Sequence, residues 1–462
     1  MPSMIKLHNT LTKRLDELQP IAPSEVSMYT CGPTVYGRAH IGNLRTYIFE
    51  DILRRTLKIS GYKVKHVMNI TDVDDKTIAR SRRDYPNDDP MAALRQLTSK
   101  YERAFLEDAQ KVGIDLSASQ IVKATDEIDE MKELIKKIPN KYIGDDGVYF
   151  DIEHYSDYGA LVKLDRSHTH HRIANDEYDK EHVADFALWK TKKEGEPGWD
   201  FDVDGQAITG RPGWHIECSA IAAKYLGQPF DIHTGGVDLI FPHHENEIAQ
   251  NSSASGKGLA NIFVHSQHLL VDGKKMSKSL NNFYTLDDIE KKGYDPLAFR
   301  LLALQAHYRT QLNFTWQALA AAESFLNNLR AWADLKLQPQ LGHKKQAADA
   351  YSQALDKIRS DLSGDLNTPQ ALSELSKLTA LAEQQGVEPR KLQLFLEQID
   401  QLLGLELANR QDVDEAVKDL IAQREQARAA QDWPKADQLR EQLIHQGVEI
   451  NDTPHGPIWS RV

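Results

Sequence analysis

Residues 26–57 read VSMYTCGPTVYGRAHIGNLRTYIFEDILRRTL. The first five residues, Val26 to Thr30, are typical of a strand. The run from Leu44 to Leu57 has apolar residues at helical spacing, which predicts an amphipathic helix. The loop between them, Pro33 to Asn43, ends in His-Ile-Gly-Asn where that helix begins. An imidazole and backbone N–H groups at a helix N-terminus can face an anion.

The residues after this stretch predict the type of sheet. Gly61 ends the helix, and Tyr62 to Ile70 alternates into a second strand. A strand, a helix and a strand in this order form a β–α–β unit, which implies a parallel sheet with its active site at the carboxyl ends of the strands. The sequence therefore predicts an α/β fold with a Rossmann-type domain.

A second segment that suits an anion is Lys275-Met276-Ser277-Lys278-Ser279, in the second half of the chain. It offers two ammonium groups on a short loop, which can neutralise a polyphosphate. Each segment alone is weak support, because a Lys/Ser loop is most often a solvated turn and a His-Ile-Gly-Asn stretch occurs by chance.

The composition is that of an ordinary globular protein. A chain of 462 residues has room for about three domains. No stretch approaches ~18 consecutive apolar residues, and the N-terminus lacks an apolar signal core, so we expect a cytoplasmic protein without membrane contact. The net charge of −12 argues mildly against nucleic acid. Net charge does not locate charge, however, and basic clusters such as Arg80 to Arg83 are present.

The residue composition and the hydrophobic periodicity change along the chain and predict several domains. Residues 1–250 are expected to form the catalytic domain, with an irregular insertion at about 115–205. The lysine loop and a connecting region would occupy 251–310, and a helical bundle 311–405. The tail, 413–462, shows one long helix pattern followed by an extended end.

Two cysteines, a histidine and a glutamate form a candidate metal site. Pro242 is placed to open a helix, and this puts His243 and Glu247 on one face at i, i+4. An imidazole, a carboxylate and the thiolates of Cys31 and Cys218 can bind zinc tetrahedrally. The alternative is a polar helix face beside two buried thiols, and spacing alone leaves both interpretations open.

Several motifs together resemble one family, the cysteinyl-tRNA synthetases, which are class I aminoacyl-tRNA synthetases. The resemblance runs from Ile5 to the last residues and therefore covers essentially the whole chain. The motifs that carry it are Tyr29 to Tyr36, His40 to Asn43, Asn69 to Lys76, Trp214 to Ser219, His243 to Glu247 and Lys275 to Ser279.

The resemblance implies the chemistry and its residues. It implies activation of L-cysteine with ATP, with Mg²⁺, and transfer to tRNA(Cys) by a monomer that holds one zinc ion.

The resemblance also implies which residues form the sites. The matching metal ligands are Cys31, Cys218, His243 and Glu247. The residues that match ATP and phosphate contacts are His40, Gly42, Asn43, Gly236, Asp238, Lys275 and Lys278. Thr71 and Trp214 match the amino-acid pocket, and Arg428, Trp433, Asp437 and Asp452 match the anticodon contacts of a small C-terminal domain. Where this chain has Asn43, the family signature often has histidine.

Two other functions remain to be weighed. A cysteine ligase acting on an amino-sugar uses the same catalytic domain, but those enzymes lack the long C-terminal part that follows Phe314 here. A non-catalytic tRNA-binding relative would be expected to lose the phosphate residues, yet His40, Lys275 and Lys278 are present. The histidines at 168, 170 and 171 resemble a metal cluster, but we interpret them as a solvated loop.

Overall fold

The computed structural model describes residues 4–162, 185–277, 280, 282–338, 346–385, 387–453 and 456–461. Contacts divide the chain into two compact units. The first comprises Met1–Pro296, Ala306–Thr315 and Ser363–Leu366, and the second comprises Leu297–Gln305, Trp316–Leu362 and Asn367–Val462. None of the helices in the described ranges combines the length and the apolar content that crossing a bilayer requires.

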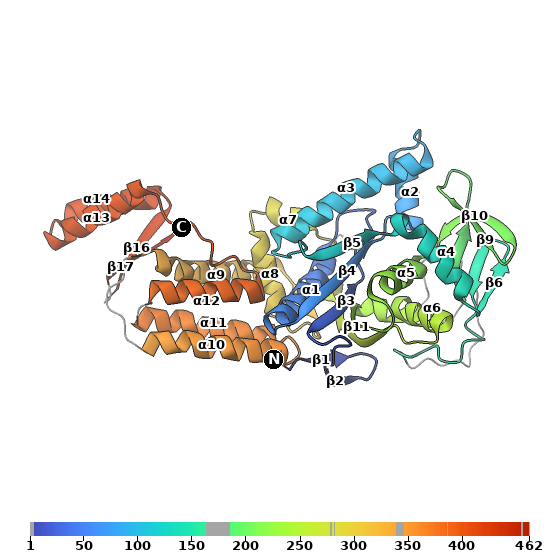
Figure 1. Cartoon of the computed structure of the whole chain (residues 1–462). Helices are drawn as coiled ribbons and strands as arrows, with labels where there is room; N and C mark the ends of the chain where they lie inside the picture. Colours follow the sequence, from blue (N-terminus) through green and yellow to red (C-terminus); the bar gives the residue numbers. More distant parts are fainter. Residues whose placement is uncertain are drawn as a thin grey trace. The chain divides into compact units, whose positions relative to one another are not determined.

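The first unit is built on a five-stranded sheet of order β12-β11-β3-β4-β5, in which every pair of neighbours is parallel. Its strands are β3 (Glu25–Thr30), β4 (Lys63–Ile70), β5 (Ser119–Lys123), β11 (Phe230–Gly236) and β12 (Ala260–Ser266). The helices around it are α1 (Ile41–Ile59), α2 (Asp75–Asp84), α3 (Pro90–Lys111), α5 (Trp214–Leu226) and α6 (Glu245–Ser255) (Figure 1). This confirms the predicted Rossmann-type fold.

The order of the strands places the site. From β3 the chain passes through α1 to β4, whereas from β11 it passes through α6 to β12 on the other side of β3. Right-handed connections therefore put α1 and α6 on opposite faces of the sheet. The direction of winding reverses between β3 and β11, and at such a switch point the carboxyl ends of two neighbouring strands form a crevice.

Of residues 115–205, where an irregular insertion is predicted, the described ones form mostly regular elements. β5 already belongs to the parallel sheet, and the chain then forms helix α4 (Ile128–Lys137) and a five-stranded sheet of order β6-β7-β8-β10-β9. All pairings in this second sheet are antiparallel. Its strands are β6 (Lys141–Gly144), β7 (Gly147–Phe150), β8 (Phe186–Thr191), β9 (Trp199–Val203) and β10 (Gln206–Pro212).

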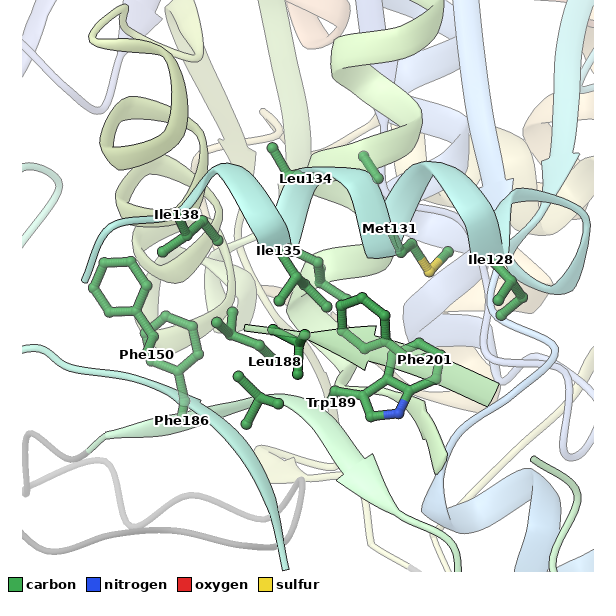
Figure 2. Close-up of a cluster of buried hydrophobic side chains, with 14 of the residues drawn as sticks. Ile128, Met131, Leu134, Ile135, Ile138, Phe150, Phe186, Leu188, Trp189 and Phe201 are labelled. Carbon is green, nitrogen blue, oxygen red and sulfur yellow. The ribbon is translucent and has the colours of Figure 1, made fainter. Parts of the chain in front are cut away.

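Apolar burial holds α4 against the antiparallel sheet. Figure 2 shows Met131 and Ile135 of α4 pointing toward Leu188 and Trp189 of β8, with Phe201 beside them. These side chains are almost completely buried. Each such side chain contributes about 1.5–3 kcal/mol relative to an exposed one. Short strands with many charged residues hid this core from the periodicity analysis.

Smaller elements complete the first unit. They are β1 (Lys6–Asn9) paired with β2 (Arg14–Glu17), the sheet of β14 (Lys274–Lys275), β13 (Leu269–Val271) and β15 (Leu312–Phe314), and helix α7 (Leu286–Lys291). β14 carries the first lysine of the predicted phosphate loop.

The second unit is mostly helical. Its helices are α8 (Pro296–Leu304, of which Pro296 belongs to the first unit), α9 (Trp316–Asp334), α10 (Gln346–Ser363, whose last residue also belongs to the first unit), α11 (Thr368–Gln385) and α12 (Pro389–Leu403). Leu319, Leu326 and Leu329 of α9 recur at helical spacing and are buried. α9 packs against α11 and α12, which confirms the expected helical region.

The tail forms two helices rather than one long helix, and its extended end forms a hairpin. The elements are α13 (Glu415–Ala429), α14 (Trp433–His445), β16 (Val448–Thr453) and β17 (Gly456–Arg461), and β16 pairs with β17 antiparallel. Figure 1 shows α13 beside α14, in agreement with their contacts. The single-helix prediction was wrong because Gln431 adopts a left-handed conformation with φ of 61°. Asp432 then caps α14 and accepts from the Lys435 N–H.

Candidate functional site

Two adjoining cavities open at the switch point of the parallel sheet. One, of about 260 Å³, reaches Cys31 and Trp214. The other, of about 150 Å³, reaches Lys275. The cavities share His40, Asn43, Thr46, Gly236 and Asp238 in their lining. Two motifs from the start of α1 and the end of β11 therefore lie between a buried thiol and a lysine.

His40 and Asn43 form a reciprocal cap at the start of α1. The Asn43 N–H donates to His40 Nδ1 over 3.1 Å, and Asn43 Oδ1 accepts from the His40 N–H over 3.3 Å. Because Nδ1 accepts, the proton of the neutral ring is on Nε2, which can donate to an anion. Burial lowers the pKa of His40 to about 4, although the carboxylate of Asp238 opposes this. Asn43 supports the histidine in this cap and keeps its amide N–H groups as donors.

Two glycines keep the cavities open. A Cβ at Gly42 would lie 2.6 Å from Cε of Met276 and 2.9 Å from Nδ1 of His40. A Cβ at Gly236 would lie 2.5 Å from Oδ1 of Asp238. A Cβ at either position would force a neighbour to shift: at Gly236 this is the end of the Asp238 side chain, whereas at Gly42 it includes the His40 ring, which its cap holds in place.

Of the predicted lysine loop, the structure describes one of the two lysines. Lys275 lies on β14, is exposed, and lines the smaller cavity together with Met276. Lys278 and Ser279 lie outside the described residues, as do the histidines at 168, 170 and 171.

Beneath the larger cavity lies a buried group of metal-binding side chains. The Sγ atoms of Cys31 and Cys218 are 3.8 Å apart, and Cys31 Sγ lies 3.7 Å from Glu247 Oε1. His243 Nε2 lies 3.1 Å from the same carboxylate oxygen, one helical turn away along the chain. These side chains could hold a metal ion, and a second set made of Cys31, His233, His244 and Glu247 could do so as well.

The spacing of the first set fits zinc. Zinc–sulfur bonds of about 2.3 Å at a tetrahedral angle place two thiolates about 3.8 Å apart. The same geometry gives about 3.6 Å between a thiolate and a carboxylate oxygen and about 3.4 Å between that oxygen and an imidazole nitrogen. The distances in the cluster are close to these values, and its donors are two thiols, one imidazole and one carboxylate.

Burial determines the protonation states in this group. It raises the pKa of the Cys31 and Cys218 thiols, and the carboxylate of Glu247 adds to the effect. It lowers the pKa of His243 to about 3. A neutral imidazole is the form that binds a metal, and the charge of a bound dication would favour the thiolates.

Further histidines, which the sequence analysis did not identify, orient this group. His215 Nδ1 lies 2.8 Å from His243 Nδ1, so His243 presents Nε2 to the carboxylate. His233 Nε2 lies 3.0 Å from Glu247 Oε2. His244 lies 3.4 Å from Cys31 Sγ, and its Nδ1 is 2.8 Å from Nε2 of His265. His215 and His244 lie inside the motifs Trp214 to Ser219 and His243 to Glu247, and this was the only available signal.

The two predicted substrate residues differ in their surroundings. Trp214 lines the larger cavity and stacks on His243, with ring centroids 4.4 Å apart. Thr71 is buried and does not line that cavity. Its hydroxyl donates to Glu217 Oε2 over 2.9 Å and accepts from Asn69 Nδ2 over 3.0 Å. Thr71 therefore belongs to a network behind the cavity wall.

The acidic motif after β4 is structural. Asp72 accepts from the N–H and hydroxyl of Thr125, and Asp74 caps α2. Asp75 pairs with Lys190 over 2.9 Å and with Arg211. These carboxylates accept hydrogen bonds from Thr125, cap α2 and form ion pairs.

Three of the four predicted anticodon residues, Arg428, Trp433 and Asp452, lie together near the junction of α13 and α14. The Arg428 guanidinium lies 5.7 Å from the ring centroid of Trp433, which is 53% exposed. Asp452 pairs with Arg428 over 3.0 Å and accepts two hydrogen bonds from Arg424. Asp437 lies on α14 and is exposed. An exposed indole beside a guanidinium is suited to stacking with bases.

Two protein families match the chain. Residues 17–324 match the family described as tRNA synthetases class I (C) catalytic domain. Residues 410–459 match the family described as cysteinyl-tRNA ligase anticodon binding domain.

Similar proteins cover almost the full length. The cysteine–tRNA ligase of Brachyspira hyodysenteriae is 42% identical, with 99% of each chain covered. That of Chlamydia muridarum is 41% identical, with 97% of this chain and 98% of the relative covered. Among solved structures, a methionyl-tRNA synthetase of Mycobacterium tuberculosis with methionyl-adenylate gives a TM-score of 0.59 at 14% identity, covering 82% of this chain and 92% of that one. This last likeness concerns the fold alone.

Proposed function

The chain belongs to the cysteinyl-tRNA synthetase family of class I aminoacyl-tRNA synthetases, and on this basis we propose how its residues carry out the family's reaction. That reaction is the charging of tRNA with cysteine: cysteine and ATP give cysteinyl-adenylate and pyrophosphate, and the cysteinyl group is then transferred to tRNA(Cys).

Cysteine is recognised, in this proposal, at the buried thiol cluster. Cys31, Cys218, His243 and Glu247 hold one zinc ion, because this set contains two soft donors and has the spacing of a tetrahedral site. The ion would supply a Lewis acid that binds the substrate as a thiolate and binds a hydroxyl far less well. Serine is nearly isosteric with cysteine, and an apolar pocket alone distinguishes such pairs by only about a hundredfold. Trp214 closes the pocket beside the metal ligands, and Thr71 supports it.

ATP occupies the adjoining cavities. The His40 Nε2–H and the Asn43 amide donate to the phosphates, and Lys275 and Lys278 neutralise them, with Mg²⁺ as the expected counter-ion. Gly42 and Gly236 allow the nucleotide to approach the backbone. Asp238 accepts hydrogen bonds from the ribose hydroxyls.

The reaction requires no protein nucleophile. The carboxylate of cysteine attacks the α-phosphorus in line, the bond to the bridging oxygen breaks, and pyrophosphate leaves. The terminal ribose hydroxyl of the tRNA then attacks the carbonyl of the adenylate, and AMP leaves. The protein contributes position and charge stabilisation.

The small C-terminal domain reads the anticodon in this proposal. Trp433 stacks on a base, Arg428 donates to base edges, and Asp437 and Asp452 accept from amino or imino groups. We further propose that the enzyme is a monomer and works in the cytoplasm. Sedimentation analysis of the purified protein tests the monomer.

The observation that carries the proposal is the pair of buried thiols beneath a cavity that also contains His40 and Asp238. Cysteine-dependent exchange between ATP and pyrophosphate tests it, with serine as the comparison and with charging of purified tRNA as the second step. Exchange that is equally fast with serine, or no exchange with cysteine, would contradict it.

A further inference from the structure

One arginine next to the nucleotide cavities has no role in the reaction described so far. Arg45 lies on α1, shortly after the residues that begin that helix, and is 3% exposed. Its Nη1 donates to the carbonyls of Gln267 and His268, each over 2.6 Å, and its Nη2 donates to the carbonyl of Thr310. Among the described residues, Arg45 forms no ion pair with a carboxylate.

Gln267 and His268, whose carbonyls Arg45 holds, belong to the lining of the 150 Å³ cavity. The connection between β12 and β13 forms one side of this cavity, through Ser266, Gln267, His268 and Leu269. The first turns of α1 form another side, through His40, Gly42, Asn43 and Thr46. Arg45 therefore connects the helix that carries the phosphate motif to the backbone on the other side of the cavity.

A second, weaker bridge joins the same two walls. The hydroxyl of Thr46 lies 2.9 Å from that of Ser266. The His268 carbonyl also accepts from the Leu312 N–H over 3.2 Å, so the connection is held partly from β15 as well. A planar guanidinium has several donors in a fixed arrangement, which lets one side chain hold carbonyls from two separate segments. Lysine offers a point charge and cannot reproduce that arrangement.

We propose that Arg45 is a positioning residue for ATP, because its guanidinium fixes the 267–268 backbone relative to α1 and thereby sets the width of the nucleotide cavity. The inference rests on the proposed function, which assigns this cavity to ATP. It is distinct from the phosphate contacts, because Arg45 acts through the carbonyls that it holds.

The test compares Arg45→Met, Arg45→Lys and the wild type in cysteine-dependent exchange, with ATP and cysteine varied separately. Both variants are expected to raise the KM for ATP by about tenfold or more, since small displacements of a binding wall have effects of this size. The KM for cysteine and the zinc content should stay within about twofold of the wild type. Calorimetric titration with ATP alone should show the same loss of affinity.

Arg54→Met is the matched control. Arg54 lies on the same helix, is 2% exposed, and donates to Asp51 over 2.8 Å and to the Asp115 carbonyl. Its loss should lower the melting temperature but leave the KM for ATP unchanged.

Three results would overturn the inference. The first is a KM for ATP in Arg45→Met that equals the wild-type value. The second is a wild-type KM for ATP in Arg45→Lys, which would make the positive charge alone sufficient. The third is a rise in the KM for ATP in Arg54→Met that is as large as the rise in Arg45→Met. If Arg45→Met does not fold, Arg45→Lys and its ATP titration decide the question. A wild-type enzyme without exchange would instead contradict the proposed function, so the two failures are distinguishable.

Discussion

The buried thiol cluster and the Arg428–Trp433 surface are constructed in opposite ways. The cluster joins Cys31, Cys218 and Glu247, which are far apart in sequence and almost completely buried. The surface joins residues that are neighbours at one helix junction, and its indole is half exposed. Burial fixes the first site before any ligand binds, whereas ion pairs at the surface hold the second. Substitutions in the first should therefore change the chemistry of activation, and those in the second should change only the use of tRNA.

The largest effect is expected at Cys218. Cys218→Ser replaces a soft donor by a hydroxyl, so zinc should be lost and exchange with cysteine should fall by more than about a thousandfold, the scale for removing a group that acts as part of a unit. Metal analysis and exchange assays measure both. Ser219→Ala is the control, since the Ser219 hydroxyl bonds Gln250 rather than the cluster. A metal-free Cys218→Ser protein that still prefers cysteine over serine would show that the buried thiol cluster does not recognise cysteine through a metal ion.

A smaller loss is expected at the lysine loop. Lys278→Ala should slow adenylate formation by about 100- to 1000-fold, which is typical for one charge-stabilising group, and the KM for cysteine should change little. Lys274→Ala is the control, because Lys274 is exposed on β14 and does not line the nucleotide cavity. Exchange rates within about threefold of the wild type for Lys278→Ala would show that the loop has no phosphate role.

The exposed indole provides the corresponding test for the other region. Trp433→Ala should weaken tRNA charging by about 5- to 150-fold, equivalent to the loss of about 1–3 kcal/mol of base stacking, and leave exchange unchanged. Ile444→Ala removes another exposed apolar side chain from α14, 46% exposed, and should change neither reaction. If Trp433→Ala slowed exchange as well, the two regions would not be functionally separate.

Point substitutions are preferable to deletion of residues 413–462. The side chain of Gln338 donates to the carbonyl of Trp459 of β17 over 2.9 Å and accepts from its N–H over 3.0 Å. Arg461 also pairs with Asp334 over 3.4 Å. Truncation would expose these partners on the helical part of the same unit, and a loss of charging would then have two causes.

The same contrast explains what the sequence could predict. The parallel sheet, α1 and the His243–Glu247 pair follow from local patterns: alternation, helical spacing, and an i, i+4 pair after Pro242. The convergence of Cys31 with Cys218 does not follow from any local pattern, and it became predictable only through the resemblance of whole motifs.

Other features depended on tertiary structure. The antiparallel sheet after α4 has short strands, and long-range pairing rather than propensity determines them. The break between α13 and α14 depends on one left-handed residue, Gln431, a conformation that glycine usually signals.

A final expected effect is a difference in acid sensitivity between the buried parallel sheet, where His66 lies on β4, and the Arg428–Trp433 surface. Burial lowers the pKa of His66 to about 3, and its two ring nitrogens contact Ser119 and Thr30 over 2.7 and 3.0 Å. The unfolded chain binds a proton at this histidine near pH 6.5, so the free energy of unfolding falls as the pH drops from about 6.5 toward 3, by up to about 1.4 kcal/mol per pH unit. The hydrogen bonds from Arg424 instead lower the pKa of Asp452. Its contribution is present above pH 4 and is lost only below about that value.

Urea unfolding at pH 7, 6 and 5 tests this difference. His66→Asn should unfold with a smaller dependence on pH than the wild type, because one buried imidazole no longer takes up a proton on unfolding. His445→Asn is the control: His445 is exposed at the end of α14, and its loss should leave the pH dependence unchanged. Equal slopes for His66→Asn and the wild type would mean that His66 is not held neutral in the folded chain. An effect of His445→Asn as large as that of His66→Asn would mean that acid sensitivity does not distinguish the buried region from the exposed one.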